Sequence, residues 1–122
     1  MLTPDNRLYD SYSIVTIELT HVGDKVVVHV AGRMDAENAT QFDQKCEACI
    51  AEGVTTMVAD LEELVYISSM GLRSFIALGK TLQEKGGQLR ICRANGLVKQ
   101  VFTITRINII FPLHESVESA LA

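Results

Sequence analysis

The sequence predicts a single α/β domain with a mixed, mostly parallel sheet of about five strands, opened by a β-hairpin and connected by about four helices. Two observations carry this prediction. Two strand-like segments near the N-terminus are separated by a short turn, and the remaining chain alternates helical and strand-like patterns. Strands that alternate with helices usually run parallel, because each helix returns the chain to the same end of the sheet. We expect residues 1–12 to form a polar N-terminal tail and residues 13–122 to form the domain.

The hairpin is predicted from two neighbouring segments. Residues 13–20, SIVTIELT, alternate apolar and polar side chains, which is typical of a half-buried strand. The residues HVGD supply a turn, and residues 25–32, KVVVHVAG, form a second and more apolar strand. The histidine of this second strand, His29, is interpreted as a packed strand residue rather than a metal ligand.

The middle of the chain predicts helix, strand and helix. Asp35 is a natural N-cap for a helical pattern that Gly53 ends. Residues 54–60, VTTMVAD, predict a central strand covered on both faces, and a helix is expected from about Ser69 to Lys85. Its apolar stripe is Leu72, Phe75, Ile76, Gly79 and Leu82, and Gly86-Gly87 ends the helix.

The C-terminal part predicts two further strands and two further helices. Residues 88–92, QLRIC, form a strand, and residues 95–105 form a short helix capped by Asn95. Residues 107–111, INIIF, are interpreted as a last short strand that the following proline stops. A terminal helix is expected after Ser116, which is its cap.

The pair Cys46 and Cys49 forms a C-x-x-C, a spacing found in metal sites and redox pairs. No second paired motif supplies further zinc ligands, and three cysteines do not make a complete disulfide framework. The pair lies inside a helical pattern, on one apolar stripe with Ala39, Phe42 and Ile50. We therefore expect buried core cysteines and no metal, and a reactive thiol site is the alternative.

Composition and motifs exclude several classes of function. The net charge of −4 argues against a nucleic-acid partner, and no apolar run is long enough for a membrane span. The N-terminus lacks the features of a signal peptide, so we expect a cytoplasmic protein without a membrane partner. No phosphate-binding glycine loop, nucleophile elbow or histidine metal spacing occurs, so we expect neither an enzyme nor a cofactor.

Two adjacent hydroxyls, Ser68 and Ser69, stand where an apolar segment passes into a helix. From the pattern alone, helix capping is the favoured interpretation. A phosphorylation switch is the alternative, because unpaired N–H groups and the helix dipole favour an anion at this position. A phosphate there should be tolerated by the fold and should act on a docked partner through its charge and bulk.

Several stretches, taken in order, decide between these interpretations. They are GRMD (32–35), VADLEELVYISSMGLRSF (58–75), EKGGQLRIC (84–92) and VKQVF (98–102). Each alone is weak, but their order and spacing together resemble the STAS domain family, and more narrowly the bacterial anti-sigma factor antagonists. The resemblance covers about residues 14 to 121 and implies a STAS fold.

The resemblance also implies a function. In these antagonists the serine two residues before the signature glycine is phosphorylated by a partner kinase that is itself the anti-sigma factor. With the glycine at Gly71, this serine is Ser69. Ser68 stands where the family usually has Asp, so it becomes a rival acceptor, and Met70 stands where the family has Ser or Thr. The implied partners are an anti-sigma serine kinase of the histidine-kinase-like ATPase class and a metal-dependent serine phosphatase.

The expected partner-binding surface combines the GRMD segment with the signature. It comprises Gly32, Arg33, Met34, Asp35, Ser68, Ser69, Met70, Gly71 and Arg73. Met70 suits either an exposed interface or core packing, since helical spacing alone does not separate the two. The alternative function is a constitutive STAS scaffold, such as a subunit of a lipid-transport or signalling complex, in which the serines only cap the helix.

Overall fold

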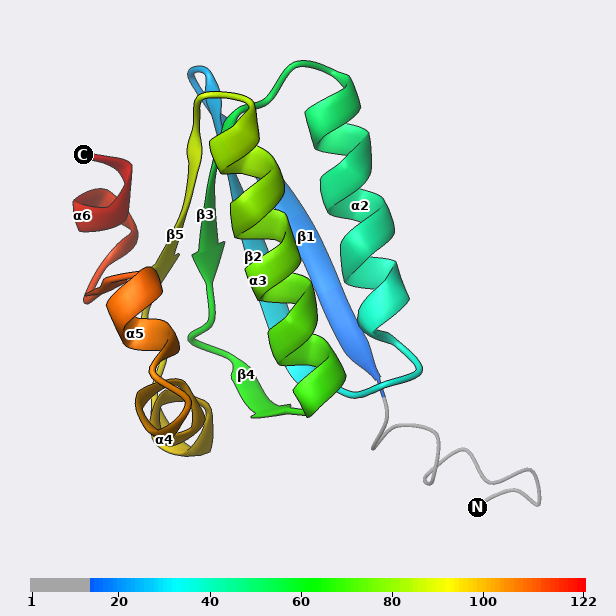
Figure 1. Ribbon diagram of the computed structural model, residues 1–122, viewed down its shortest axis with the longest axis vertical. Coiled ribbons are helices and arrows are strands. Elements are labelled where there is room, and N and C mark those ends of the chain that lie inside the picture. The colour runs from blue at the N-terminus through cyan, green and yellow to red at the C-terminus, as the bar shows by residue number, and fades with distance from the viewer. Residues whose placement is uncertain (1–13) are drawn as a thin grey trace.

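The computed structural model describes residues 14–122, so the predicted tail at residues 1–12 lies outside the described residues (Figure 1). The chain opens with β1 (Val15–Val22) and β2 (Lys25–Met34), which pair antiparallel. The turn between them contains Gly23 in the left-handed region at φ 64°, a conformation that glycine adopts without a steric penalty. The predicted hairpin is confirmed.

Four further strands complete the sheet in the described part of the chain. β3 (Thr56–Asp60), β5 (Gln88–Cys92) and β6 (Leu113–His114) follow β2 in the order β1-β2-β3-β5-β6, and β4 (Leu64–Ile67) pairs with the end of β2. All pairings except the hairpin are parallel. The prediction of a mixed, mostly parallel sheet is therefore confirmed.

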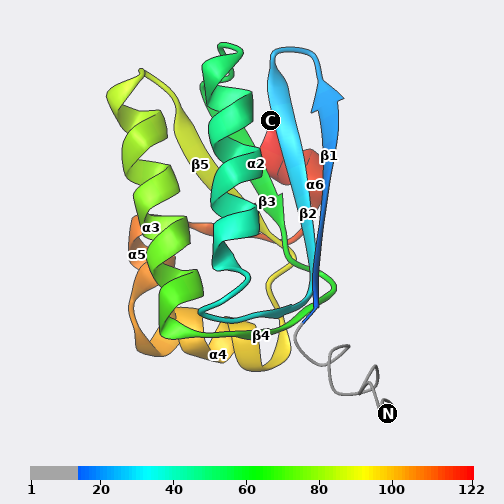
Figure 2. The ribbon, with the colours of Figure 1, turned by 90° about the vertical axis from the view of Figure 1, so that its right-hand side faces the viewer.

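Helices cover the two faces of this sheet unequally. α2 (Ala39–Ala51) and α3 (Ser69–Glu84) lie side by side on one face (Figures 1 and 2). α4 (Gly96–Ile104) closes the end of the sheet at which α3 begins (Figure 2), and its side chains Val98 and Phe102 are buried in the main core. The short α6 (Val117–Leu121) covers part of the opposite face, where Ala120 packs with Val27, Val58 and Cys92.

The predicted helix stripes are largely observed. Ala39, Phe42, Cys46 and Cys49 are the buried residues of α2. In α3 the buried set includes Phe75, Gly79 and Leu82, as expected. Ile76 is an exception, because it is 41 % exposed and Leu78 is buried instead. The buried stripe of α3 is thus rotated by a small part of a turn from the predicted position, toward Ser74 and Leu78.

The prediction of a strand at residues 107–111 is wrong. Ile107–Ile110 forms the short helix α5, and the edge strand β6 begins only at Leu113. Arg106 adopts a left-handed conformation at φ 63° and lets the chain turn directly from α4 into α5. A short apolar run does not by itself distinguish strand from helix, and here the edge of β5 is occupied by the residues that follow the run.

The prediction that Asp35 is the N-cap of α2 is also wrong. The helix begins at Ala39 and its N-cap is Asn38. A carboxylate oxygen of Asp35 instead accepts hydrogen bonds from the backbone N–H groups of Glu37 and Asn38, both at 2.9 Å. Asp35 therefore stabilises the turn that precedes the helix, because its short side chain accepts from N–H groups two and three residues ahead.

Candidate functional site

The GRMD segment and the signature meet at the start of α3. Residues 32–34 are the last residues of β2 rather than a loop, and β4 pairs alongside them, with Met34 opposite Ile67. The carbonyl oxygen of Met34 accepts a hydrogen bond of 2.9 Å from the backbone N–H of Ser68. Two segments that lie more than thirty residues apart in the sequence are therefore side by side in the structure.

The two serines have different surroundings. Ser68 is the N-cap of α3, and its hydroxyl oxygen accepts a hydrogen bond of 3.2 Å from the backbone N–H of Gly71. Ser69 is the first helical residue and is exposed. Within residues 14–122 its hydroxyl has no hydrogen-bond partner. Capping is therefore performed by Ser68 and leaves Ser69 free for other chemistry.

The surroundings of Ser69 favour an anion. The hydroxyl of Ser68 and the first helical hydrogen bond, from Leu72 to the carbonyl oxygen of Ser68, satisfy two of the first N–H groups of α3. The N–H groups of Ser69 and Met70 have no intrahelical partner, as at every helix start. The first turn contains no acidic residue. Unpaired N–H groups and the positive end of the helix dipole stabilise a negative group at this position.

Two residues of the expected partner-binding surface are buried. Met34 has no exposed surface, and Gly71 is buried directly above it. A Cβ atom on Gly71 would lie 2.7 Å from Cγ1 of Ile67 and 3.1 Å from Cγ of Met34. The expectation that the GRMD segment is exposed is therefore wrong for Met34. The place of both residues in the structure is to let α3 approach β2 and β4 closely, so they shape the surface from beneath.

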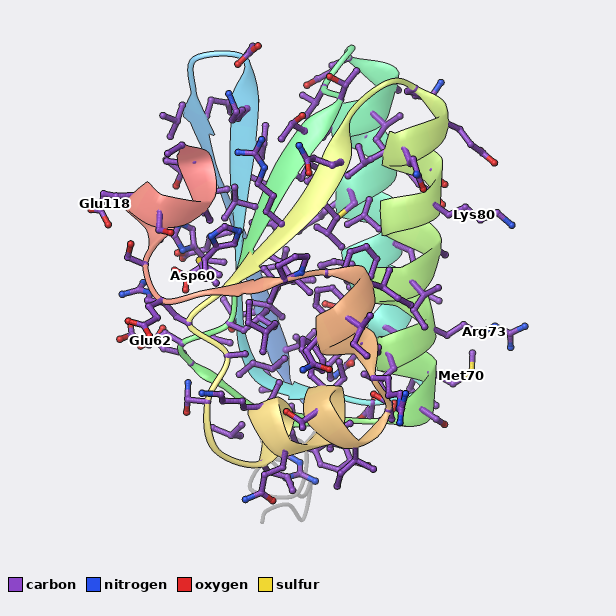
Figure 3. The ribbon with its side chains drawn as sticks, turned by 60° about the vertical axis from the view of Figure 1, so that its left-hand side comes forward. Asp60, Glu62, Met70, Arg73, Lys80 and Glu118 are labelled. Atoms are coloured by element: carbon purple, nitrogen blue, oxygen red, sulfur yellow. The ribbon has the colours of Figure 1, made fainter. Side chains whose placement is uncertain are left out.

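The other expected surface residues are accessible to different degrees. Met70 is 43 % exposed, so it lies on the surface rather than in the core, and it projects from α3 on the same side as Arg73 (Figure 3). Arg33 is half-buried, and its guanidinium carbon lies 4.3 Å above the ring centre of Tyr66, a cation–π contact. Gly32 has φ 93°, and a Cβ there would meet the carbonyl oxygen of Ile14 at 2.5 Å.

A groove of about 300 Å³ runs between α2 and α3 beside Met70. Its walls combine apolar side chains with charged ones at the rim: Phe42, Asp43, Cys46, Glu47, Ile50, Met70, Arg73, Ser74, Ala77, Leu78 and Thr81. The site therefore offers a partner an apolar depression that is lined by Met70, the residue after Ser69. No group of three or more potential metal ligands gathers in the part of the chain that the structure describes.

We expect Asp35 to contribute to stability through its acceptor atoms and to partner binding through its charge. Asp35→Ala removes both backbone hydrogen bonds and should cost about 1–2 kcal/mol of unfolding free energy. Asp35→Asn keeps an acceptor oxygen without the charge, so its melting temperature should stay close to that of the wild type. Thermal melting of both variants, together with partner affinity, separates the two contributions. Full binding by Asp35→Asn would show that the charge is unimportant.

An ion-pair cluster at the end of β3, away from Met70 and Arg73 (Figure 3), was not predicted. Asp60, at the buried end of β3, accepts hydrogen bonds from Arg93 at 3.0 and 2.7 Å, and the ring nitrogen Nδ1 of His29 lies 2.8 Å from its carboxylate. Burial alone would raise the pKa of Asp60, but the hydrogen bonds from Arg93 and His29 lower it overall. Arg93 also pairs with Glu62 at 3.0 Å (Figure 3 labels the two acids). The cluster holds the segment that leads from β3 into β4 and the signature.

One signal in the sequence could have indicated this cluster. Asp60 ends an apolar strand, and a carboxylate in a buried position requires a partner. The sequence does not show which of the basic residues is that partner, since Arg93 follows 33 residues later. His29 is half-buried in β2, as expected of a strand residue, but its contact with Asp60 was not predicted.

The cysteines behave as core residues. Cys46, Cys49 and Cys92 are all buried free thiols. Burial raises the pKa of Cys46 to about 12 and that of Cys92 to about 11. Because the thiolate is the reactive form, we expect native protein at pH 7 to react negligibly with a thiol reagent over minutes, and denatured protein to show three thiols. Rapid labelling of Cys46 or Cys49 in native protein would support the alternative of a thiol site.

Comparison with known proteins gives the family. The family model described as the STAS domain matches residues 16–120. The chain belongs to the STAS domain family. This STAS domain is 31 % identical over 106 residues to BtrV of Bordetella bronchiseptica, which is provisionally named an anti-sigma factor antagonist; the match covers 87 % of this chain and 91 % of BtrV. The recognition made from the motifs is thus confirmed.

Solved structures show the same fold. An anti-sigma factor antagonist from Mycobacterium paratuberculosis superimposes with a TM-score of 0.80 at 23 % identity, over 88 % of this chain and 92 % of that one. SpoIIAA, an anti-sigma factor antagonist solved in unphosphorylated form, gives a TM-score of 0.77 at 21 % identity, over 87 % and 93 % of the two chains. The phosphorylated form of Bacillus SpoIIAA gives 0.71 at 20 % identity, over 87 % and 96 %. In the described residues of this STAS domain, no helix is long and apolar enough to cross a membrane.

Proposed function

We propose that this STAS domain is an anti-sigma factor antagonist whose binding to an anti-sigma factor is controlled by phosphorylation of Ser69. The observation that carries the proposal is the division of labour between the two serines. Ser68 caps α3 through its hydroxyl, whereas the hydroxyl of Ser69 is exposed and has no partner within residues 14–122. A kinase can reach Ser69 without breaking a hydrogen bond of the fold.

The names of the related proteins support this proposal. BtrV and SpoIIAA are both named as anti-sigma factor antagonists, provisionally in the case of BtrV, and SpoIIAA exists in phosphorylated and unphosphorylated forms. For this chain we propose the corresponding partners: an anti-sigma serine kinase of the histidine-kinase-like ATPase class, and a metal-dependent serine phosphatase that restores the hydroxyl. Unphosphorylated protein binds the anti-sigma factor and releases the sigma factor, and phosphorylated protein dissociates.

The proposed mechanism depends on where the phosphate lies. A phosphate on Ser69 carries about −1.5 to −2 charges at neutral pH. It stands beside the unpaired N–H groups of the first turn, which stabilise it within the domain. Ser69 directly precedes Met70, which lines the groove between α2 and α3. A partner docked there would have to bury the dianion or leave a gap around it, so its affinity falls while the fold is retained.

The experiment that tests the proposal maps the modification. The protein is incubated with ATP and the candidate kinase, and the site is identified by mass spectrometry. Ser69→Ala should abolish phosphorylation and should trap the kinase in a pull-down, because the complex can no longer be released. Ser68→Asp is the matched control, since Asp also caps helices and should leave phosphorylation of Ser69 intact. Phosphate on Ser68 alone would overturn the proposal.

A further inference from the structure

The outer surface of α4 and α5 (Ile107–Ile110) is the most exposed apolar region of the described chain. Ile104, Ile109 and Ile110 are 79 %, 68 % and 61 % exposed, the highest values among the large apolar side chains of residues 14–122, and Leu97 is 52 % exposed. Leu97 and Ile104 are seven residues apart and therefore share one face of α4. We call Leu97, Lys99, Ile104, Arg106, Ile109 and Ile110 the α4–α5 face.

The exposed apolar side chains of the α4–α5 face do not contribute to the packing of the core. The buried side of α4 consists of Val98 and Phe102, which belong to the main core. On the outer side, the hydroxyl of Thr103 donates to the carbonyl oxygen of Lys99, so its polar group is satisfied within the helix. The exposed aliphatic side chains thus stand outside the packing that holds α4 in place. A cluster of such side chains on a water-exposed surface is typical of an interaction site.

The charge of this face differs from that of the whole protein. Residues 94–114 contain no Asp or Glu, in a chain whose net charge is −4. Lys99 and Arg106 are exposed, and neither forms an ion pair with another residue of the described range 14–122. A shallow groove along α4 is lined by Gly96, Lys99, Gln100, Thr103 and Ile104, without a carboxylate. On its other side Lys99 also lines a hollow with Glu62 and Glu115, so among the described residues carboxylates border the face only there. The face itself is apolar and basic.

We propose that the α4–α5 face binds an acidic amphipathic helix of a protein partner. Its aliphatic side chains match the apolar stripe of such a helix, and Lys99 and Arg106 match acidic residues that flank the stripe. A two-fold contact between copies of this chain would instead bring like charges together. An extended anionic bilayer would be repelled by the negative charge of the rest of the protein. A single helix contacts only the α4–α5 face, and charges farther away than the screening length of about 8 Å affect it little.

The proposal is independent of the phosphorylation switch. α4 and the start of α3 lie at the same end of the molecule (Figures 1 and 2), so one partner could span both surfaces. However, neither the contacts nor the charges of the α4–α5 face involve Ser69. A partner helix can therefore bind here whether or not Ser69 is phosphorylated. Ser69→Ala should leave binding at this face unchanged, which separates the two proposals experimentally.

The test uses a designed fluorescent peptide of about 18 residues, with leucines at helical spacing on one side and glutamates flanking them. We expect fluorescence anisotropy to show saturable binding to the full chain. Binding should weaken about tenfold or more in Ile104→Ser/Ile109→Ser and in Lys99→Glu/Arg106→Glu. The matched control is Ile76→Ser/Lys80→Glu on the outer side of α3, where both side chains are also exposed; it should bind like the wild type.

Several results would overturn the proposal. One is the absence of binding at millimolar peptide, and another is equal binding of a peptide in which lysines replace the glutamates. In a third, the protein binds phosphatidylserine-containing vesicles but not the peptide, and the Ile104→Ser/Ile109→Ser variant no longer binds the vesicles. This result would assign the face to membranes. A fourth is concentration-dependent self-association in analytical ultracentrifugation that the same variant abolishes, which would assign the face to a second copy of the chain. Circular dichroism of each variant confirms that it is folded.

Discussion

Phosphorylation of Ser69 is expected to weaken binding to the anti-sigma factor at least about a hundredfold, while the melting temperature of the domain stays the same or rises slightly. A hundredfold loss corresponds to about 2.8 kcal/mol, which one dianion placed at a desolvated contact can supply. Within the domain, the same group lies at the N-terminus of α3, where an exposed anion gains about 0.3–1 kcal/mol. Titration calorimetry and thermal melting of enzymatically phosphorylated protein measure both quantities.

The comparison requires unphosphorylated protein and Ser69→Ala as references. Removal of a free, exposed hydroxyl should leave affinity and melting temperature nearly unchanged, since Ser69 makes no hydrogen bond through its side chain in the described structure. An Asp substitution is a poor mimic, because it carries less charge and fewer acceptor oxygens than a phosphate. Unchanged affinity after phosphorylation would reject the switch. A large fall in melting temperature would mean that the phosphate disrupts the fold.

Among the possible glycine-to-alanine substitutions in this chain, Gly87→Ala is expected to cause the largest loss of stability. A Cβ atom there would lie 1.6 Å from the carbonyl oxygen of Thr55, which accepts the hydrogen bond of Gln88. The clash is with backbone, so β3 and β5 would have to separate at the start of their pairing. Overpacking typically costs 1–3 kcal/mol, and we expect about 3 kcal/mol or more. For a domain of this size the melting temperature should fall by about 12 °C.

The neighbouring glycine provides the control. Gly86 adopts φ 86°, and a Cβ atom there would meet nothing within 4 Å. Asn tolerates the left-handed region better than other side chains, so Gly86→Asn should melt within a few degrees of the wild type. Differential scanning calorimetry of Gly86→Asn and Gly87→Ala then distinguishes the cost of a left-handed backbone conformation from the cost of a steric clash with the neighbouring strand. Equal melting temperatures for the two variants would contradict the assignment of Gly87 to a steric role.

The sequence by itself determined the local features of this protein. Alternation of apolar and polar residues indicated the hairpin, and the three-and-four spacing of Phe42, Cys46 and Cys49 indicated a helix with buried thiols. The motifs led to the STAS domain family and to Ser69 as the candidate acceptor. The hairpin and the helix are accessible from sequence because each depends on residues within a few positions of one another, through side-chain periodicity and turn chemistry. The family and Ser69 came instead from the resemblance of several stretches in one order along the chain.

Only the tertiary structure decided what depends on distant segments. It showed that Ser68 is the capping serine, that Met34 and Gly71 lie beneath the surface rather than on it, and that Asp60 is paired with Arg93. It also showed that residues 107–110 form a helix with exposed aliphatic side chains rather than a strand. The physical reason is the same in each case. Exposure and pairing follow from which segments pack together, and a side chain's own sequence neighbourhood does not contain that information.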